Sequence, residues 1–130
     1  MPSLQHTTRT IALVGASNKP ERASYGVMAF LLSKGYVVYP VNPVLAGQEI
    51  QGQKVYASLE DCPAPIDMVD IFRNNEDAAK LIDEAIALKE KLQLKTIWCQ
   101  LGVTPVDAAK RAQEAGLAVV MDRCLAIEWR

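Results

Sequence analysis

The residues best suited to hold an anionic ligand lie in a loop near the start of the chain, GASNKPERASY (15–25). Gly15 permits a tight exit from a strand, and Ser17 offers both a hydroxyl and a backbone N–H group. Lys19 and Arg22 add positive charge. Free N–H groups at the start of a following helix would complete a phosphate-binding site. The alternative interpretation is an ordinary surface loop.

This loop differs from the G-x-G-x-x-G fingerprint of dinucleotide-binding proteins. Ser17 and Pro20 stand where the second and third glycines would be. The next apolar run, YVVYPVNP (36–43), ends without the Asp or Glu that NAD enzymes use to bind the ribose hydroxyls. Asn42 could contact a sugar, a base edge or a phosphate, or it could belong to a simple turn. These differences count against NAD as the ligand.

Two later strand ends also carry groups that could contact a ligand. In IFRN (71–74), Phe72 could stack on a planar base and Arg73 could pair with a phosphate in a bidentate manner. A solvated arginine after a core phenylalanine is the alternative. In CQLGV (99–103), the Gln100 amide could meet an amide-rich ligand chain, or the segment could be only a turn before a helix.

The cysteines and the single histidine do not indicate catalysis or metal binding. The spacing of Cys62, Cys99 and Cys124 fits neither a zinc site nor a disulfide framework. His6 lies in the N-terminal segment, so no Cys-His pair is apparent. We expect Cys99 in the core, Cys62 exposed in a Pro-rich loop, and Cys124 as a structural cysteine. Thiol exchange between Cys124 and a ligand is the alternative.

The overall composition is that of a soluble globular protein. Half of the residues are hydrophobic, 22% are charged, and the net charge is −1. This balance predicts no general attraction to nucleic acid or to anionic membranes, so local donors must hold an anionic ligand. We find no apolar run of about 20 residues and no secretory h-region, and we expect a cytoplasmic protein. Asp67 and Asp70, on one apolar run, are assigned solvated or capping roles.

Alternating strands and helices must position these residues. The expected strands cover 10–15, 36–43, 66–72, 95–102 and 117–122, and the expected helices cover 24–35, 75–92 and 104–116. We expect helix N-caps at Ser24 and Thr104, and helix ends at Gly35 and Gly116. Between the second and third strands, residues 44–66 are expected to be irregular, with a short strand near KVYAS.

This alternation predicts an α/β fold. We expect a Rossmann-like, doubly wound, mainly parallel sheet of about five strands, with helices on both faces in three layers. Residues 1–130 are expected to form one domain, with 1–9 as an N-terminal extension. Right-handed crossovers place the carboxyl ends of the strands at one edge, where such sheets bind ligands. Lys19, Arg22, Arg73 and Arg123 are expected to converge there.

Five segments, taken together, resemble a known family. VGASNKPERASY, YPVNP, VDIFRN, WCQLGV and GLAVVMDRC, in this order and spacing, resemble the small bacterial and archaeal CoA-binding protein family over about residues 10–128. That family is similar to the CoA-binding N-terminal domain of the succinyl-CoA synthetase alpha subunit. The resemblance implies a ligand site for coenzyme A formed by Gly15, Ala16, Ser17, Lys19, Pro20, Arg22, Ser24, Tyr25, Val41, Asn42, Pro43, Phe72, Arg73 and Gln100.

The resemblance also implies different roles for these residues. The first loop would surround the CoA pyrophosphate or 3′-phosphate, the end of the second strand would lie near the adenosine, and the later residues would line the rest of the groove. In the synthetase the phosphorylated histidine lies in a second domain, and no histidine here matches it. We therefore expect binding of CoA or an acyl-CoA without catalysis. An NAD(P)-binding oxidoreductase-like domain and a CoA-sensing regulatory or interaction subunit are the alternatives.

Overall fold

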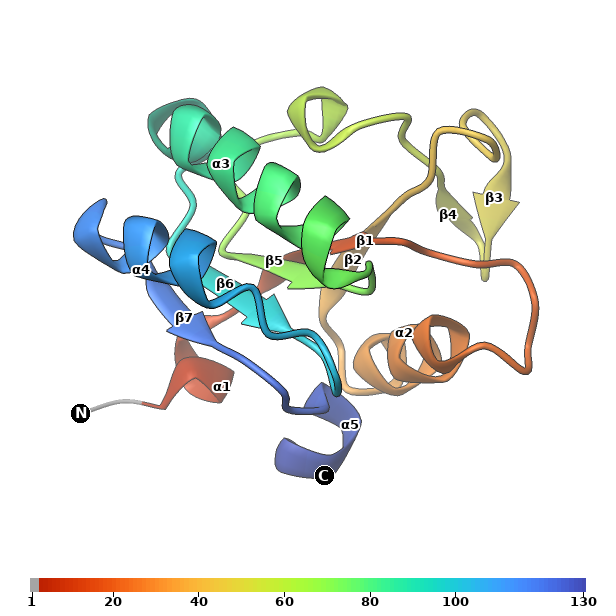
Figure 1. Ribbon diagram of the computed structural model, residues 1–130. Coiled ribbons are helices and arrows are strands. Elements are labelled where there is room, and N and C mark those ends of the chain that lie inside the picture. The colour runs from red at the N-terminus through yellow and green to blue at the C-terminus, as the bar shows by residue number, and fades with distance from the viewer. Residues whose placement is uncertain (1–2) are drawn as a thin grey trace.

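The computed structural model describes residues 3–130, and a five-stranded parallel sheet lies at its centre (Figure 1). The strands are β1 (Thr10–Val14), β2 (Val37–Val41), β5 (Met68–Ile71), β6 (Thr96–Cys99) and β7 (Ala118–Val120). Their order is β2-β1-β5-β6-β7, and every neighbouring pair is parallel. The predicted Rossmann-like sheet is confirmed.

Helices cover both faces of this sheet, as predicted. Figure 1 shows α3 (Asn75–Leu92) and α4 (Val106–Glu114) on one face, and α2 (Ala23–Ser33) and α5 (Leu125–Glu128) on the other. Strand residues alternate between two buried clusters: Leu13 faces the α2 side, whereas Val69 faces the α3 side. This alternation follows from the two-residue period of a strand, and it produces three layers.

The helix boundaries show which capping predictions hold. The predicted range of α3 is correct, and Asn74 caps it by accepting the Asp77 N–H (N···O 2.8 Å). Ser24 is not the N-cap of α2, because Arg22 holds that position without a side-chain bond. Thr104 is not the N-cap of α4, which begins after Pro105. The Thr104 N–H instead donates to Asn75 Oδ1, and so ties the β6–α4 loop to α3.

The segment between β2 and β5 is more ordered than the sequence suggests. It contains the antiparallel pair β3 (Glu49–Ile50) and β4 (Gln53–Lys54), followed by a short 3₁₀ helix, η1 (Leu59–Asp61). Cys62 follows η1 and is buried, so its predicted exposure is wrong. A further helix, α1 (Leu4–Thr7), lies in the predicted extension. Across the described residues, no helix is long and apolar enough to cross a membrane.

The topological switch point lies between β1 and β5, because the chain leaves β1 toward β2 and returns on the other side of β1 to form β5. The ends of these two strands approach each other closely. The Phe72 N–H donates to the Val14 carbonyl oxygen (N···O 2.8 Å), and Gly15 adopts φ +92° beside the Phe72 carbonyl. A Cβ on residue 15 would lie 2.9 Å from the Phe72 carbonyl carbon. Only glycine fits this position without movement of a strand end.

We therefore expect Gly15→Ala to destabilise the fold strongly. The added methyl group meets backbone rather than a flexible side chain, and a positive φ adds strain, so the free energy of unfolding should fall by roughly 3 kcal/mol. Gly35→Ala is the matched control, since Gly35 has φ +87° with no heavy atom within 4 Å of a built Cβ. It should cost about 1 kcal/mol. Denaturant titration measures both, and equal losses would show that the contact with Phe72 is unimportant.

Candidate functional site

Two adjoining cavities hollow the C-terminal edge of the sheet, and the larger is strongly cationic. Its volume is about 540 Å³, and it lies between the β1–α2 loop, the first turn of α2 and the segment after β2. Lys19, Arg22 and Arg73 line it, and no carboxylate from the described residues does. Of these cations, Arg73 is paired with Asp77, whereas Lys19 and Arg22 have no ion pair among the described residues, and this positive charge favours an anionic ligand.

The start of α2 supplies hydrogen-bond donors to this larger cavity. Ala23 and Ser24, the first two residues of the helix, both line the cavity. Among the described residues, no acceptor takes the backbone N–H of either one. Such free N–H groups, at the positive end of the helix dipole, bind phosphate groups well. Within the loop, the Ser17 hydroxyl accepts the Lys19 N–H (N···O 3.1 Å), which holds the loop in its turn.

The smaller cavity, of about 260 Å³, lies on the α3 side of the same edge. Its apolar walls come from three elements: Val41 at the end of β2, Leu59 of η1 and Leu81 of α3. Gly15, Asn42 and Arg73 line both cavities, so the two form one groove across the end of β1. A ligand with an anionic centre and a flat apolar end could occupy both.

Asn42 makes three side-chain hydrogen bonds that hold the groove together. Its Oδ1 accepts the N–H groups of Val44 (N···O 2.8 Å) and Leu45 (N···O 3.2 Å). Its Nδ2 donates to the Ala16 carbonyl oxygen (N···O 2.9 Å). The side chain therefore connects the loop after β2 to the loop after β1. This supports the turn interpretation of Asn42, although a role in ligand contact stays a prediction.

Asp70 is the unexpected polar residue beside the site, because it is fully buried rather than solvated or capping. It lies in β5, two residues before Phe72, and has 0% exposure. Gln100 Nε2 donates to its Oδ1 (N···O 2.7 Å), whereas Oδ2 has no partner within the described residues. Burial raises the pKa of Asp70 to about 7, and the Gln100 bond opposes this rise. Asp67, in contrast, caps β1 as predicted, by accepting the Arg9 and Thr10 N–H groups.

The structure brings together most of the predicted site residues. Eleven of the fourteen line one or both cavities: Gly15, Ala16, Ser17, Lys19, Arg22, Ser24, Asn42, Phe72 and Arg73 in the larger cavity, with Val41 and Pro43 added in the smaller one. Pro20, Tyr25 and Gln100 line neither cavity.

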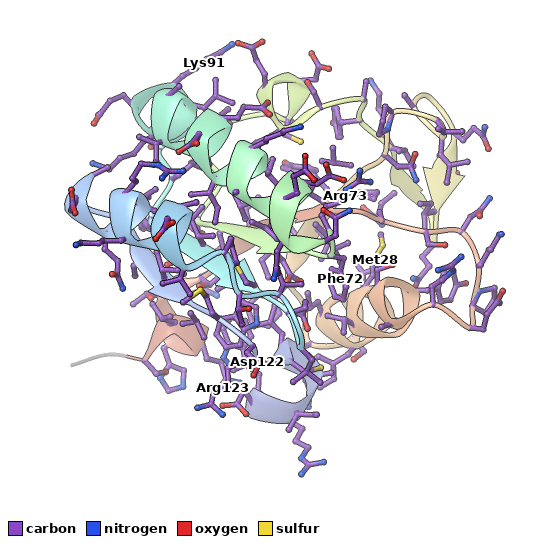
Figure 2. All side chains as sticks on the ribbon, viewed as in Figure 1. Met28, Phe72, Arg73, Lys91, Asp122 and Arg123 are labelled. Carbon is purple, nitrogen blue, oxygen red and sulfur yellow. The ribbon has the colours of Figure 1, made fainter. Side chains whose placement is uncertain are left out.

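Two of these residues, Gln100 and Tyr25, are engaged elsewhere in the fold, and one expected cation lies away from the groove. Gln100 is only 5% exposed, and its amide is directed to Asp70. The Tyr25 carbonyl oxygen accepts Gln51 Nε2 (N···O 3.0 Å), which ties α2 to the β3–β4 turn. Arg123 does not converge with the other cations: Figure 2 shows it on the α5 side, away from Arg73. Its carbonyl oxygen accepts Trp98 Nε1 (N···O 2.8 Å).

Sequence reasoning missed the wall that α3 and η1 contribute to the smaller cavity. Asp77, Leu81 and Glu84 line it from one face of α3. Their spacing of three and four residues is the signal that could have placed them on a common face. Ser58 and Leu59 also line it, but they come from a segment that the sequence marks only as irregular.

The chain is similar to several known proteins. A family model described as "CoA binding domain" matches residues 9–130. The protein YneT of Bacillus subtilis (strain 168) is 33% identical over 124 residues, which cover 95% of this chain and 87% of YneT. The structure of "cell-free ID.343" from Thermus thermophilus has a TM-score of 0.89 and 36% identity, and the match covers 97% of this chain and 91% of that one.

A further similarity is to part of a larger protein. The alpha subunit of acetate–CoA ligase (ADP-forming) I from Pyrococcus furiosus is 39% identical over 80 residues. That match covers 58% of this chain but only 17% of the ligase subunit. The similarity to the ligase is therefore confined to a small part of that subunit.

We expect Asp70 to make stability depend on pH. In the unfolded chain an aspartate titrates near pH 3.9, whereas the pKa of folded Asp70 is about 7. Between these values the unfolded chain releases a proton that the folded chain keeps, so stability should fall as pH rises from about 4 to about 7. Asp70→Asn cannot ionise, and its Oδ1 can still accept the Gln100 bond. It should remove a pH dependence worth a few kcal/mol, at about 1.4 kcal/mol per pKa unit.

Denaturant titrations from pH 4 to pH 8 measure this effect. Asp107→Asn is the control, since it removes an exposed carboxyl group in the first turn of α4. If the Asp70→Asn and wild-type profiles are parallel, Asp70 is not the group responsible.

Proposed function

The chain belongs to the CoA-binding domain family, and from this we propose that it binds coenzyme A, or an acyl-CoA, in the groove without catalysing a reaction of its own. The observation that carries the proposal is the larger cavity, which combines three cations, no carboxylate from the described residues and the N-terminus of α2. With a net charge of −1, the chain can hold a polyanion only by such local donors.

The shape of the groove suits the two ends of the CoA nucleotide. The diphosphate fits the larger cavity, where Lys19, Arg22 and the free N–H groups of α2 can hold its charges. The adenine fits the smaller cavity, whose walls include Val41, Leu59 and Leu81. Three residues line both cavities, so the two adjoin and one extended ligand can contact both.

One alternative ligand, NAD, is less well supported by the same geometry. An NAD site requires an acid after β2 for the ribose hydroxyls. That position carries Asn42, whose amide already makes three bonds to the protein. The acids of the smaller cavity come from α3 instead, and Asp77 is paired with Arg73 (N···O 2.9 Å). CoA therefore fits the groove better.

Binding without catalysis is supported by where the nucleophilic and basic groups lie. His6 precedes β1 and lines a separate cavity with Lys34 and Gly35, at the opposite edge of the sheet. Burial raises the pKa of the Cys62 and Cys99 thiols to about 12, so neither is a reactive thiolate at neutral pH. A CoA-sensing regulatory or interaction subunit would use the same groove and differs from plain binding only in having a protein partner.

The ligand can be identified without presupposing it. Native mass spectrometry of the purified protein should show a CoA-sized adduct that is lost on denaturation. Calorimetry should then show binding of CoA and much weaker binding of NAD and NADP. Binding of NAD(P) with none of CoA would reverse the assignment.

Arg22→Ala should weaken CoA binding with little effect on stability. Arg22 lines the larger cavity and makes no side-chain capping bond to α2, so its loss removes a charge-assisted contact to phosphate. We expect CoA affinity to fall by roughly tenfold or more. Lys110→Ala removes an exposed cation of α4 outside both cavities and is the control. An equal loss of melting temperature in Arg22→Ala would show that Arg22 is structural.

A further inference from the structure

Arg73 occupies the junction of the two cavities. It follows Phe72 at the end of β5 and directly precedes Asn74, the N-cap of α3. Figure 2 shows it beside the start of α3, with Phe72 toward the α2 side. Gly15, Asn42 and Arg73 line both cavities, and Arg73 is the charged residue of the three. Any ligand that spans the groove must pass it.

The chemical order of the CoA nucleotide determines which group would reach this junction. The ribose connects the adenine to the diphosphate, and in CoA it carries a 3′-phosphate. If the adenine occupies the smaller cavity and the diphosphate the larger, the ribose lies between them. The 3′-phosphate then comes within reach of Arg73, whose planar guanidinium can hold a phosphate by two parallel bonds.

Arg73 is available for such a contact. Its single ion pair joins Nη2 to Asp77 Oδ2 (2.9 Å), and both side chains are substantially exposed, at 46% and 37%. Exposed pairs of this kind are weak, so a dianionic phosphate can recruit the guanidinium from Asp77. In the free protein, the pair keeps Arg73 beside the junction. The other cation of the smaller cavity, Lys80, is farther along α3 and is paired with Glu76.

From this geometry we infer that Arg73 binds the 3′-phosphate of the bound nucleotide. This contact would make the groove selective for CoA over dephospho-CoA, which lacks that phosphate. The inference rests on the proposed function and adds to it the group that determines selectivity. It separates two tasks within the groove: Lys19, Arg22 and the α2 N-terminus hold the diphosphate common to both ligands, and Arg73 recognises the phosphate that only one of them carries.

The test is a calorimetric comparison of CoA and dephospho-CoA at one ionic strength, with wild type, Arg73→Ala, Arg73→Lys and Lys80→Ala. Wild type should bind CoA roughly 10- to 100-fold more tightly than dephospho-CoA. In Arg73→Ala the two affinities should agree to within about threefold, because the variant should lose much more affinity for CoA than for dephospho-CoA. Arg73→Lys should be intermediate because it keeps the charge but not the planar fork. Lys80→Ala should lower the ratio less than Arg73→Ala does.

Each other result overturns a distinct part of the argument. Equal binding of CoA and dephospho-CoA by wild type would overturn the selectivity while leaving CoA binding intact. A ratio that survives Arg73→Ala but is lost in Lys80→Ala would assign the 3′-phosphate to Lys80. Failure of wild type to bind either ligand would overturn the proposed function itself. The wild-type ratio tests the selectivity even if a variant does not fold.

Discussion

The close approach of Gly15 to the Phe72 backbone is the constraint on which the site depends. At this point the ends of β1 and β5 meet at the topological switch point, and the N–H groups of Gly15 and Ala16 both donate to the Val41 carbonyl oxygen of β2. Three strand ends are thus joined through a few backbone contacts. Because the two cavities lie on either side of β1, this contact also positions both halves of the groove.

Around this contact, polar side chains serve mainly to hold loops in place. Asn42 connects the loops after β1 and β2, and Asn75 connects the start of α3 to the loop after β6. These bonds hold the backbone of the groove in place, and the cationic side chains of Lys19, Arg22 and Arg73 extend from it. A preformed frame lowers the conformational entropy that a ligand must remove when it binds. Asp70 and Gln100 extend the polar bonding beneath the site, where an apolar core would be expected.

The sequence predicted the elements well because their signals are local. The two-residue alternation in the strands and the amphipathic period of α3 depend only on neighbouring residues, and the order of elements then implies a parallel sheet with helices on both faces. Capping was less predictable. Ser24 and Thr104 have suitable side chains, but the N-caps are Arg22, two residues earlier, and Pro105, one residue later, and the Thr104 N–H donates to Asn75.

The sequence by itself determined the type of fold, the edge of the sheet where the cavities lie and eleven of the residues that line them, because strand ends and glycine or cation positions can be read along the chain. Only the tertiary structure decided how those residues are used. It buried Cys62 and Asp70, directed Gln100 away from the groove and brought α3 and η1 to its wall. These outcomes depend on contacts between segments far apart in sequence, and no local pattern encodes which side chains will meet there.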